Sequence, residues 1–193
     1  MMILAFDATA GVCAAALVCD GEVIASQAEA MEKGHAERLF PMIREMMDGH
    51  DLSSIDAVAV CTGPGNFTGA RIGVAAARGL ALSLGARSIG VDRFECAVGH
   101  DDACIVLPGR GASVHAANYD AGTLTTAATI DRTDLPAFAG GRTVVEVDAV
   151  DLAALARVAA EKLSDGDAPR PAPRYLRPVN AALPSEAPPP LLP

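Results

Sequence analysis

One stretch constrains the fold more than any other: an apolar run passes through a glycine-rich turn into a long apolar helix and then into a second apolar run. Ile55–Cys61 is predicted to be a buried strand, Thr68–Leu84 a helix, and Ser88–Val91 the next strand. Strands joined by one helix in this way pair in parallel, and the connection is right-handed. The sequence therefore predicts an α/β fold built around a parallel pair of strands.

An antiparallel meander and a first helix are predicted before this unit. Ile3–Phe6, Ala14–Cys19 and Glu22–Gln27 are strand-like runs. Asp20-Gly21 separates the last two and favours a tight hairpin. A helix follows over Ala36–Asp48. Its apolar side chains repeat at helical spacing, at Leu39, Met42, Ile43, Met46 and Met47.

The second half of the chain carries weaker patterns. Strands are predicted over Ala103–Leu107, Val114–Tyr119, Thr123–Ile130 and Thr143–Val147, and helices over Asp92–Val98 and Leu152–Leu163. Nine of the thirteen prolines lie from Pro169 onwards, which disfavours regular structure there. The elements predict a two-lobed ribonuclease-H-like fold, with a first lobe over 1–99, a smaller second lobe over 100–165 and a Pro-rich tail over 166–193.

The composition describes a folded acidic chain. Hydrophobic residues make up 51%, charged residues 20%, and the net charge is −9. Such a surface repels a polyanion, so a role in RNA chemistry needs a partner that supplies positive charge. No apolar stretch reaches the roughly 20 residues that cross a bilayer, and the first residues lack the basic region of a signal peptide. The five cysteines lack Cys-x-x-Cys spacing and are expected to be reduced, which favours the cytoplasm.

The glycine-rich turn is the first candidate site. It could present the amides of a helix start to an anion or to a partner's carboxylate, and Thr68 is expected to cap that helix. A tight structural turn explains the same pattern, and no Gly-Lys-Ser/Thr follows as in a P-loop. The candidates for a conformational or nucleotide loop are Gly63, Pro64, Gly65, Asn66, Phe67, Thr68, Gly69 and Arg71, together with Asp7 and Thr9. No tightly bound cofactor is expected, and weak or interface-dependent nucleotide binding stays open.

The two helices of the first lobe are apolar on more sides than one sheet can cover, which predicts an interface with another chain. Packing between the two helices accounts for part of this excess. The candidate partner contacts are Leu39, Phe40, Met42, Ile43, Met46, Ile72, Ala76 and Gly79. The histidines, by contrast, show no spacing typical of metal ligands, and no set of catalytic residues can be nominated.

Several motifs resemble the TsaB (YeaZ) family. Leu4-Ala5-Phe6-Asp7 resembles its opening Leu-Ala-x-Asp strand, and the run His35–Leu39 its His-x-Glu-Arg-Leu helix start. Gly63–Gly73 is similar to Gly-Pro-Gly-Ser-Phe-Thr-Gly-Leu-Arg-Ile-Gly, a long and specific string. Near the end of the chain, Arg174–Arg177 resembles the Tyr-Leu-Arg tail of the family. The likeness is strong over the first half of the chain and faint beyond it.

This resemblance implies an actin-like ATPase fold and a role in making threonylcarbamoyladenosine (t6A) in tRNA. In that system the transferase TsaD modifies N6 of the adenosine 3′ of the anticodon, and TsaB pairs with TsaD through first-lobe helices. The ATPase TsaE joins the complex, and TsaB homodimers use the same helices. The resemblance therefore implies a non-catalytic dimerisation subunit that meets tRNA only indirectly.

Two departures from the related sequences bear on that role. TsaD holds its metal with two histidines after the strand that follows its second helix, whereas Val91–Ala97 contains no histidine. The TsaB motif Asp-Ala-Arg-x-x-Glu-Val-Tyr of the second lobe reads Pro108–His115 here and lacks the Asp, Glu and Tyr. The alternative function is a stand-alone actin-fold ATPase or small-molecule kinase that uses Asp7 and the Gly63–Gly69 loop. A peptidase, the other alternative, would need a nucleophile or metal set that the sequence does not offer.

Overall fold

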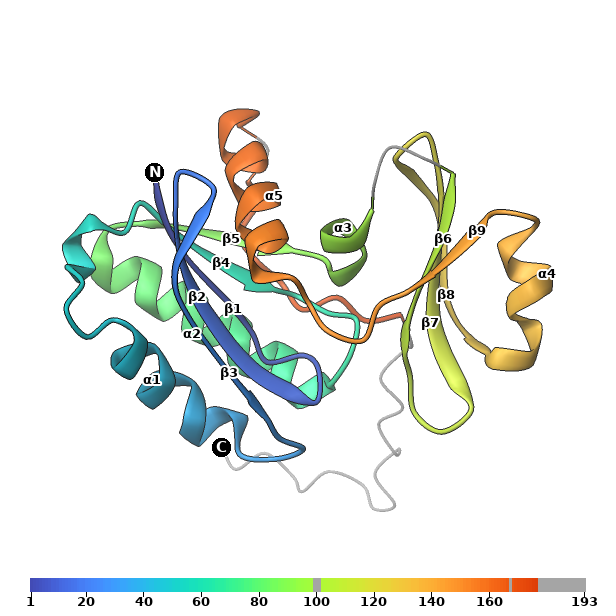
Figure 1. The fold of residues 1–193 in the computed structure, drawn as a ribbon, viewed down its shortest axis with the longest axis horizontal. Coiled ribbons are helices and arrows are strands. Elements are labelled where there is room, and N and C mark those ends of the chain that lie inside the picture. The colour runs from blue at the N-terminus through green and yellow to red at the C-terminus, as the bar shows by residue number, and fades with distance from the viewer. Residues whose placement is uncertain (99–101, 167, 177–193) are drawn as a thin grey trace, which may run out of the picture.

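The computed structural model describes residues 1–98, 102–166 and 168–176, which form two β-sheets with helices around them (Figure 1). The first sheet has the strand order β3-β2-β1-β4-β5. Its strands are β1 (Met2–Asp7), β2 (Val12–Cys19), β3 (Glu22–Ala30), β4 (Ala57–Cys61) and β5 (Arg87–Val91). The first three pair antiparallel, and β4 pairs in parallel with both β1 and β5.

Side chains that alternate along the strands give the first sheet two apolar faces. On one face, Leu4 and Phe6 pack beneath α1 (His35–Met46) and α2 (Phe67–Leu84). On the other face lies α5 (Leu152–Ser164), which packs against β1, β2, β4 and β5. Figure 1 shows this layering, with the sheet between α5 and the pair α1 and α2.

The second sheet has the strand order β8-β7-β6-β9. Its strands are β6 (Ala103–Pro108), β7 (Ser113–Asp120), β8 (Thr123–Asp131) and β9 (Thr143–Glu146). The short helix α3 (Arg93–Ala97) inserts Phe94 against one face of this sheet, and the short helix α4 (Leu135–Ala139) covers the other. Because both helices are short, the second lobe buries fewer side chains than the first.

The sequence predictions for thirteen elements are confirmed with small shifts at their ends, and the two-lobed α/β fold is as expected. Asp20 and Gly21 form the β2–β3 turn, both with positive φ. The sequence did not predict α4, whose Pro136 near its first turn was a sign of a helix start. It also missed the short 3-10 turns η1 (Leu52–Ser54) and η2 (Arg132–Asp134).

One placement differs from the domain division expected from the sequence. α5 lies within the 100–165 range of the predicted second lobe, yet it packs on the first sheet. The described part of the tail, residues 168–176, has no regular structure but lies against the first lobe, with Pro171 buried. We call residues 168–176 the strap. The rest of the predicted tail, 177–193, lies outside the described residues.

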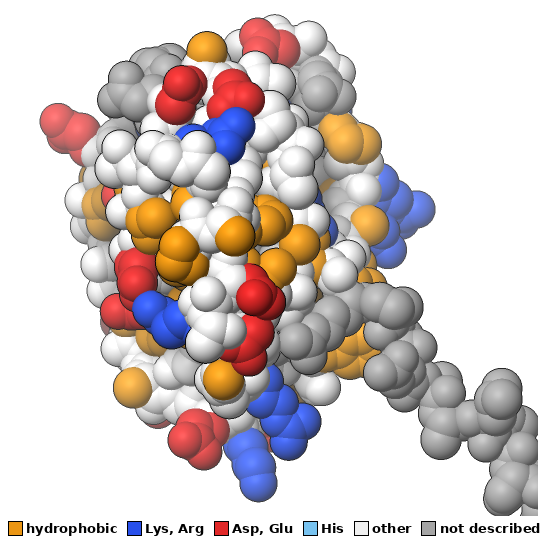
Figure 2. Space-filling view, turned by 90° about the vertical axis from the view of Figure 1, so that its right-hand side faces the viewer, with side chains coloured by type: hydrophobic (Ala, Val, Ile, Leu, Met, Phe, Trp, Pro, Cys, Tyr) orange, Lys and Arg blue, Asp and Glu red, His pale blue; other side chains and the backbone are white. Residues whose placement is uncertain are grey.

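The surface of the second lobe is partly apolar. Figure 2 views the molecule from that side and shows hydrophobic side chains gathered in the middle of the face, with acidic and basic groups around them. In this lobe Leu124, Val144 and Val145 are each more than a third exposed. All five cysteines are free thiols, as expected. Within the described ranges, no helix is long and apolar enough to cross a membrane.

Candidate functional site

The end of β1 is a closed polar turn. Asp7 is buried, and its Oδ1 accepts hydrogen bonds from the backbone amide of Thr9 at 2.7 Å and from the Thr9 hydroxyl at 2.6 Å. The Thr9 hydroxyl also lies 3.4 Å from the Cys61 sulfur. The second carboxylate oxygen of Asp7, Oδ2, is buried without a hydrogen-bond partner. The carboxylate thus holds its own turn together through one oxygen only.

The glycine-rich loop is clamped against this turn. A Cβ at Gly65 would lie 2.1 Å from the Thr9 carbonyl oxygen, and a Cβ at Gly69 would lie 1.8 Å from that of Ala8. The amide of Asn66 donates to the Thr9 carbonyl at 2.7 Å. Close backbone approach therefore explains Gly65 and Gly69, because no other residue fits there. Of Gly63, Gly65 and Gly69, only Gly63 adopts a positive φ, of 107°.

The start of α2 is capped by Asn66 and not by Thr68 as the sequence suggested. The Asn66 side-chain oxygen accepts hydrogen bonds from the amides of Thr68 and Gly69, both at 3.0 Å. Asn66 has an extended backbone, as an N-cap requires, whereas Thr68 already lies within the first turn. Two amides at the helix start are therefore already used within the chain.

The strap closes over the other side of the loop. The amide of Arg174 donates to the Thr62 carbonyl at 2.9 Å, and Arg78 donates to the Pro171 carbonyl. Arg71 donates to the Tyr175 hydroxyl at 2.8 Å. The loop that the sequence singled out is therefore enclosed by the β1 turn on one side and by the strap on the other.

Two aromatic rings lie where the start of α2 meets the strap. The rings of Phe67 and Tyr175 lie 4.7 Å apart, and the Arg71 guanidinium stacks 3.8 Å above the Phe67 ring. Both rings stay more than a third exposed. Two segments that the sequence analysis treated separately thus meet in one cluster: Gly63–Gly73 and Tyr175 of the Tyr-Leu-Arg tail. Arg177 of that tail lies outside the described residues.

An ion pair between a partly exposed arginine and a buried carboxylate fixes the strap to α3. Arg174 pairs with the carboxylate of Asp92, which is 4% exposed and caps α3 by accepting the amide of Phe94 at 2.7 Å. Burial raises the pKa of Asp92 to about 6, although Arg174 and the Phe94 amide both act to lower it. The ordinary value for an aspartate is about 3.9. The carboxylate is thus held in a place that favours its protonated form.

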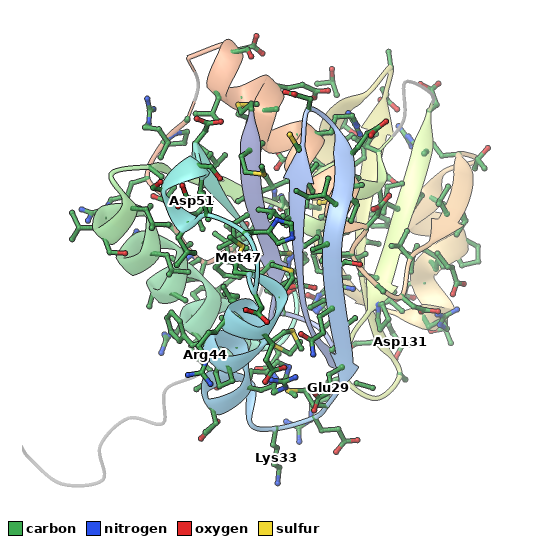
Figure 3. The ribbon with its side chains drawn as sticks, turned by 60° about the vertical axis from the view of Figure 1, so that its left-hand side comes forward. Glu29, Lys33, Arg44, Met47, Asp51 and Asp131 are labelled. Atoms are coloured by element: carbon green, nitrogen blue, oxygen red, sulfur yellow. The ribbon has the colours of Figure 1, made fainter. Side chains whose placement is uncertain are left out.

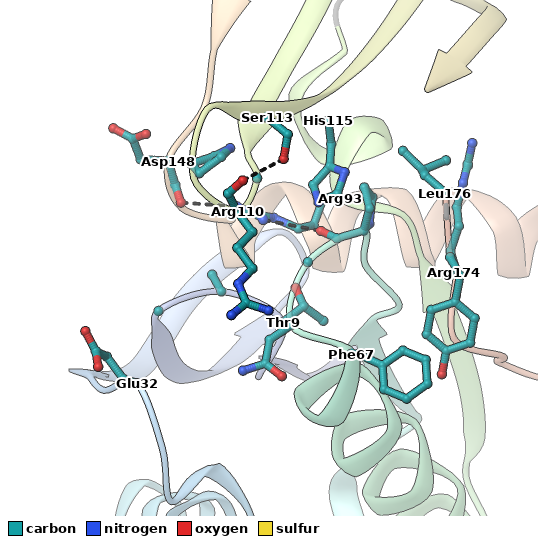
Figure 4. Close-up of a pocket in the computed structure, with 18 of the residues that line it drawn as sticks. Thr9, Glu32, Phe67, Arg93, Arg110, Ser113, His115, Asp148, Arg174 and Leu176 are labelled. Atoms are coloured by element: carbon teal, nitrogen blue, oxygen red, sulfur yellow. Dashed lines mark hydrogen bonds between the residues drawn. The ribbon is translucent and has the colours of Figure 1, made fainter. Parts of the chain in front are cut away.

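A cleft of ≈ 1180 Å³ lies between the two lobes, and the β1 turn, the glycine-rich loop and the strap line one side of it. From the second lobe come Arg110, Ser113 and His115, and from α3 comes Arg93 (Figure 4). The His115 ring nitrogen Nδ1 lies 2.8 Å from the Thr129 hydroxyl. The sequence analysis did not nominate these four cleft residues, because they lie far from the loop in the chain and carry no shared motif.

The predicted partner contacts fall into two groups. Leu39, Met42, Ile43, Met46 and Ala76 are buried in the core beneath α1 and α2, so they lack the exposed surface that a partner contact needs. Phe40 and Gly79 are exposed, and Ile72 is partly so. The sequence missed Leu82, which is 86% exposed on α2. The apolar stripe read from helical spacing is mainly the core-facing one.

Within the described residues, no group of three His, Cys, Asp or Glu side chains is placed to hold a metal ion. His35, the first residue of α1, is buried, and its Nε2 lies 3.2 Å from the Ala10 carbonyl oxygen. This contact ties α1 to the β1–β2 turn and gives the histidine a structural role.

Comparison with known proteins places these features in a family. Residues 21–134 match the family model described as TsaD, tRNA N6-adenosine threonylcarbamoyltransferase. The tRNA threonylcarbamoyladenosine biosynthesis protein TsaB of Escherichia coli (strain K12) is 42% identical over 93 residues, which are 47% of this chain and 40% of that protein. The TsaB of Haemophilus influenzae (strain Rd) is 39% identical over 84 residues, 42% of this chain and 35% of that protein. The matches thus span well under half of either relative.

A solved structure agrees over a longer span. YeaZ from Pseudomonas aeruginosa superimposes with a TM-score of 0.72 and 24% sequence identity, covering 91% of this chain and 99% of that chain. The likeness at this level of identity shows a common fold. It extends over both lobes, whereas the sequence match to the TsaB proteins covers less than half of the chain.

Proposed function

We propose a docking role for this chain, which belongs to the TsaD family and to its TsaB/YeaZ branch. It serves in the biosynthesis of threonylcarbamoyladenosine in tRNA as a non-catalytic subunit that binds a TsaD-type transferase. The relatives supply the pathway, since TsaB is named for it. The docking role is our inference from the surface of this chain. We further propose that the subunit works in the cytoplasm, meets a TsaE-type ATPase in the same complex and meets tRNA only through its partners.

The observation that carries the docking role is the outer surface of the first-lobe helices. On α2, Ala75, Gly79 and Leu82 recur at a spacing of four and three and are exposed, so they lie along one stripe. On α1, the Phe40 side chain is 49% exposed. Exposed apolar side chains on adjacent helices are typical of a protein interface. We call Phe40, Ala75, Gly79 and Leu82 the outer stripe.

Two further features of this surface suit a close helix-to-helix contact. A Cβ at Gly79 would meet nothing within 4 Å, so a partner helix can approach the backbone there. Arg44 lies on the outward side of α1, where Figure 3 shows its side chain pointing away from the sheet. A charged group at the edge of an apolar stripe is the usual rim of an interface. A second copy of this chain could occupy the same surface when the transferase is absent.

The test uses substitutions that change the outer stripe without touching the core. Gly79→Arg and Leu82→Glu place a long or charged side chain where the partner would pack. We expect each to weaken binding to the TsaD-type subunit from the same organism at least about tenfold, because an interface charge left unpaired costs more than about 1.4 kcal/mol. Binding is measured by isothermal titration calorimetry, with light scattering to give the mass of the complex.

Two controls separate docking from folding. Gly79→Ala adds only a methyl group and should weaken binding less than Gly79→Arg does. Leu124→Glu makes the same apolar-to-acid change on the second lobe, where Leu124 is 38% exposed, and should bind like the wild type. If Gly79→Arg and Leu82→Glu bind the transferase like wild type while folding normally, the docking proposal fails.

The alternative, a stand-alone ATPase or kinase, is favoured by one observation, the buried and unpartnered Oδ2 of Asp7 near a large cleft. The clamped contact between the β1 turn and the glycine-rich loop leaves no space there for phosphates, which favours the docking role. ATP turnover by the isolated chain, lost in Asp7→Asn, would decide for the enzyme.

A further inference from the structure

Arg71 is an exposed cation that is held in one position and has no acidic partner. Its Nε donates to the Tyr175 hydroxyl at 2.8 Å. Its Cζ lies 3.8 Å from the centre of the Phe67 ring and 5.8 Å from that of the Tyr175 ring. Within the described part of the chain, no carboxylate pairs with Arg71, and its two Nη groups have no hydrogen-bond partner. We call Phe67, Arg71 and Tyr175 the stacked cluster.

Anchoring of the strap does not account for this cluster. The strap is held independently by the ion pair of Arg174 with Asp92 and by the Arg174 amide, which donates to the Thr62 carbonyl at 2.9 Å. Arg71 instead gains a fixed orientation from its two aromatic neighbours. A side chain that is ordered before it meets a partner loses less conformational entropy on binding, which strengthens the contact it makes.

The stacked cluster continues the outer stripe along α2. Exposed residues recur on this helix at a spacing of four and finally three, at Phe67, Arg71, Ala75, Gly79 and Leu82. Residues at this spacing share one face of a helix. The last three belong to the outer stripe, so the first two extend the same face toward the start of α2.

The surroundings of Arg71 suit a protein partner that brings a negative charge. Phe67 and Tyr175 line the interlobe cleft, whereas Arg71 does not, so the cation lies on the helix surface. The chain as a whole has a net charge of −9, and an exposed arginine without an acid among the described residues is therefore a local exception. The rings also keep water from part of the guanidinium, and a charge pair is stronger where water is excluded.

From this arrangement we propose that the docking surface continues from the outer stripe onto the stacked cluster, where Arg71 pairs with a carboxylate side chain of the transferase partner. The two free Nη groups can donate to a carboxylate, which makes a charge-assisted contact. Tyr175 positions Arg71, so the strap, made at the other end of the chain, becomes part of the interface. This inference rests on the proposed docking role and adds to it the chemistry of one contact.

The experiment measures binding of the full chain to the TsaD-type subunit by calorimetry at low and at high sodium chloride. Arg71→Gln should weaken binding at least about tenfold at low salt, because an arginine ordered by aromatic rings is typical of a binding hot spot. It should also reduce the salt dependence of the affinity, since the lost contact is ionic. Tyr175→Ala should weaken binding about threefold or more, because Arg71 then loses its fixed orientation.

Two further variants test the roles within the cluster. Arg71→Lys keeps the charge without the planar stacking and should bind between Arg71→Gln and the wild type. In the double variant of Arg71→Gln and Tyr175→Ala, the loss should be smaller than the product of the two single losses, because both changes remove the same contact. Independent losses would overturn the positioning role of Tyr175.

The matched control is Arg157→Gln, which makes the same change of charge on α5. Arg157 lies in an exposed pair with Glu161, and α5 covers the opposite face of the first sheet from α2. This variant should bind the transferase subunit like the wild type. Circular dichroism of each variant checks that the fold is kept.

The outcomes separate this inference from the docking role itself. If Leu82→Glu loses binding while Arg71→Gln and Tyr175→Ala bind like the wild type, docking stands and its extension onto the stacked cluster is overturned. If Leu82→Glu itself binds like the wild type, the docking role fails. Weaker binding of Arg71→Gln with an unchanged salt dependence would overturn the partner carboxylate.

Discussion

At the scale of single residues, glycines decide how closely the first-lobe loops approach. Gly69 and Gly79 lie in the same helix, yet their surroundings differ. A Cβ at Gly69 would overlap the Ala8 carbonyl oxygen at 1.8 Å, whereas one at Gly79 would meet nothing within 4 Å. The glycine at 69 is therefore required by packing against the backbone, and the glycine at 79 leaves an open surface on the outer stripe.

This difference predicts opposite effects of one substitution. Gly69→Ala should destabilise the chain by about 2–3 kcal/mol or more, because backbone atoms cannot move away as a flexible side chain can. Gly79→Ala should stabilise it by about 0.5–1 kcal/mol, since alanine is the better helix former. Urea unfolding of both variants checks this. Equal unfolding midpoints would contradict the packing argument.

The candidate loop shows what a sequence can and cannot reveal at this scale. The order Gly-Pro-Gly-Asn-Phe-Thr-Gly pointed to a tight turn before α2, and the turn is there. The sequence could not predict that Arg93 and Arg110 line the same cleft, because nothing local in the chain specifies that α3 and the β6–β7 loop border one hollow. The sequence also could not show that Met42 and Ile43 are buried. Helical spacing identifies an apolar stripe, but it does not tell whether the stripe faces the core or a partner.

At the scale of elements, the strap lines the cleft together with the β1 turn and the glycine-rich loop. It has no regular structure, so its stability comes from its contacts with Thr62, Arg78, Asp92 and Arg71. A Cβ at Gly90 would meet Pro171 at 3.2 Å, so the strap also packs closely on β5. The proline content correctly argued against helix or strand, but the docking of the strap depends on residues about 80–110 positions earlier in the chain, which local patterns do not encode.

Two truncations test the strap as an element. A chain that ends at residue 176 keeps every described strap contact and serves as the reference for stability. A chain that ends at residue 166 leaves the Asp92 carboxylate without Arg174 and Arg78 without the Pro171 carbonyl. It should lose about 3 kcal/mol or more, because a buried carboxylate then lacks its ion-pair partner. Urea unfolding followed by far-UV circular dichroism measures both. Equal stability of the two chains would contradict a docked strap.

At the scale of the whole molecule, the two lobes share parts. α5 follows the second lobe in the chain but covers the first sheet, and Phe94 follows the first sheet in the chain but packs into the second. Leu176 of the strap also packs against the second cluster. The chain therefore crosses between lobes more than once, and neither lobe has a complete core without a segment from the other half of the sequence.

The pH dependence of the whole molecule reflects Asp92. Its pKa is about 6 when folded, mainly because of burial, and about 3.9 when unfolded. Between these values the folded chain binds more protons than the unfolded chain, so this residue makes stability fall as pH rises from 4 to 6. The shift corresponds to about 3 kcal/mol.

Asp92→Asn removes this titration while keeping an oxygen that can cap α3. Compared with the variant, the wild type should lose up to about 3 kcal/mol in relative stability as pH rises from 4 to 7. Exposed carboxylates with lowered pKa, such as Asp51 and Asp131, lose their contribution as pH falls and are the same in both proteins. Urea unfolding at a series of pH values gives the difference, and a constant difference would contradict a buried Asp92.

The late position of the strap has a consequence during synthesis. About 80 residues separate the end of β5 at Val91 from the start of the strap, which the ribosome adds in roughly 4–16 s at typical bacterial rates. Throughout that interval the newly made amino-terminal half carries α1 and α2 but lacks the strap, and for most of it α5 is absent as well. The nascent chain thus exposes one apolar face of the first sheet to chaperones. The cleft between the lobes is complete only after the strap has been made and has docked.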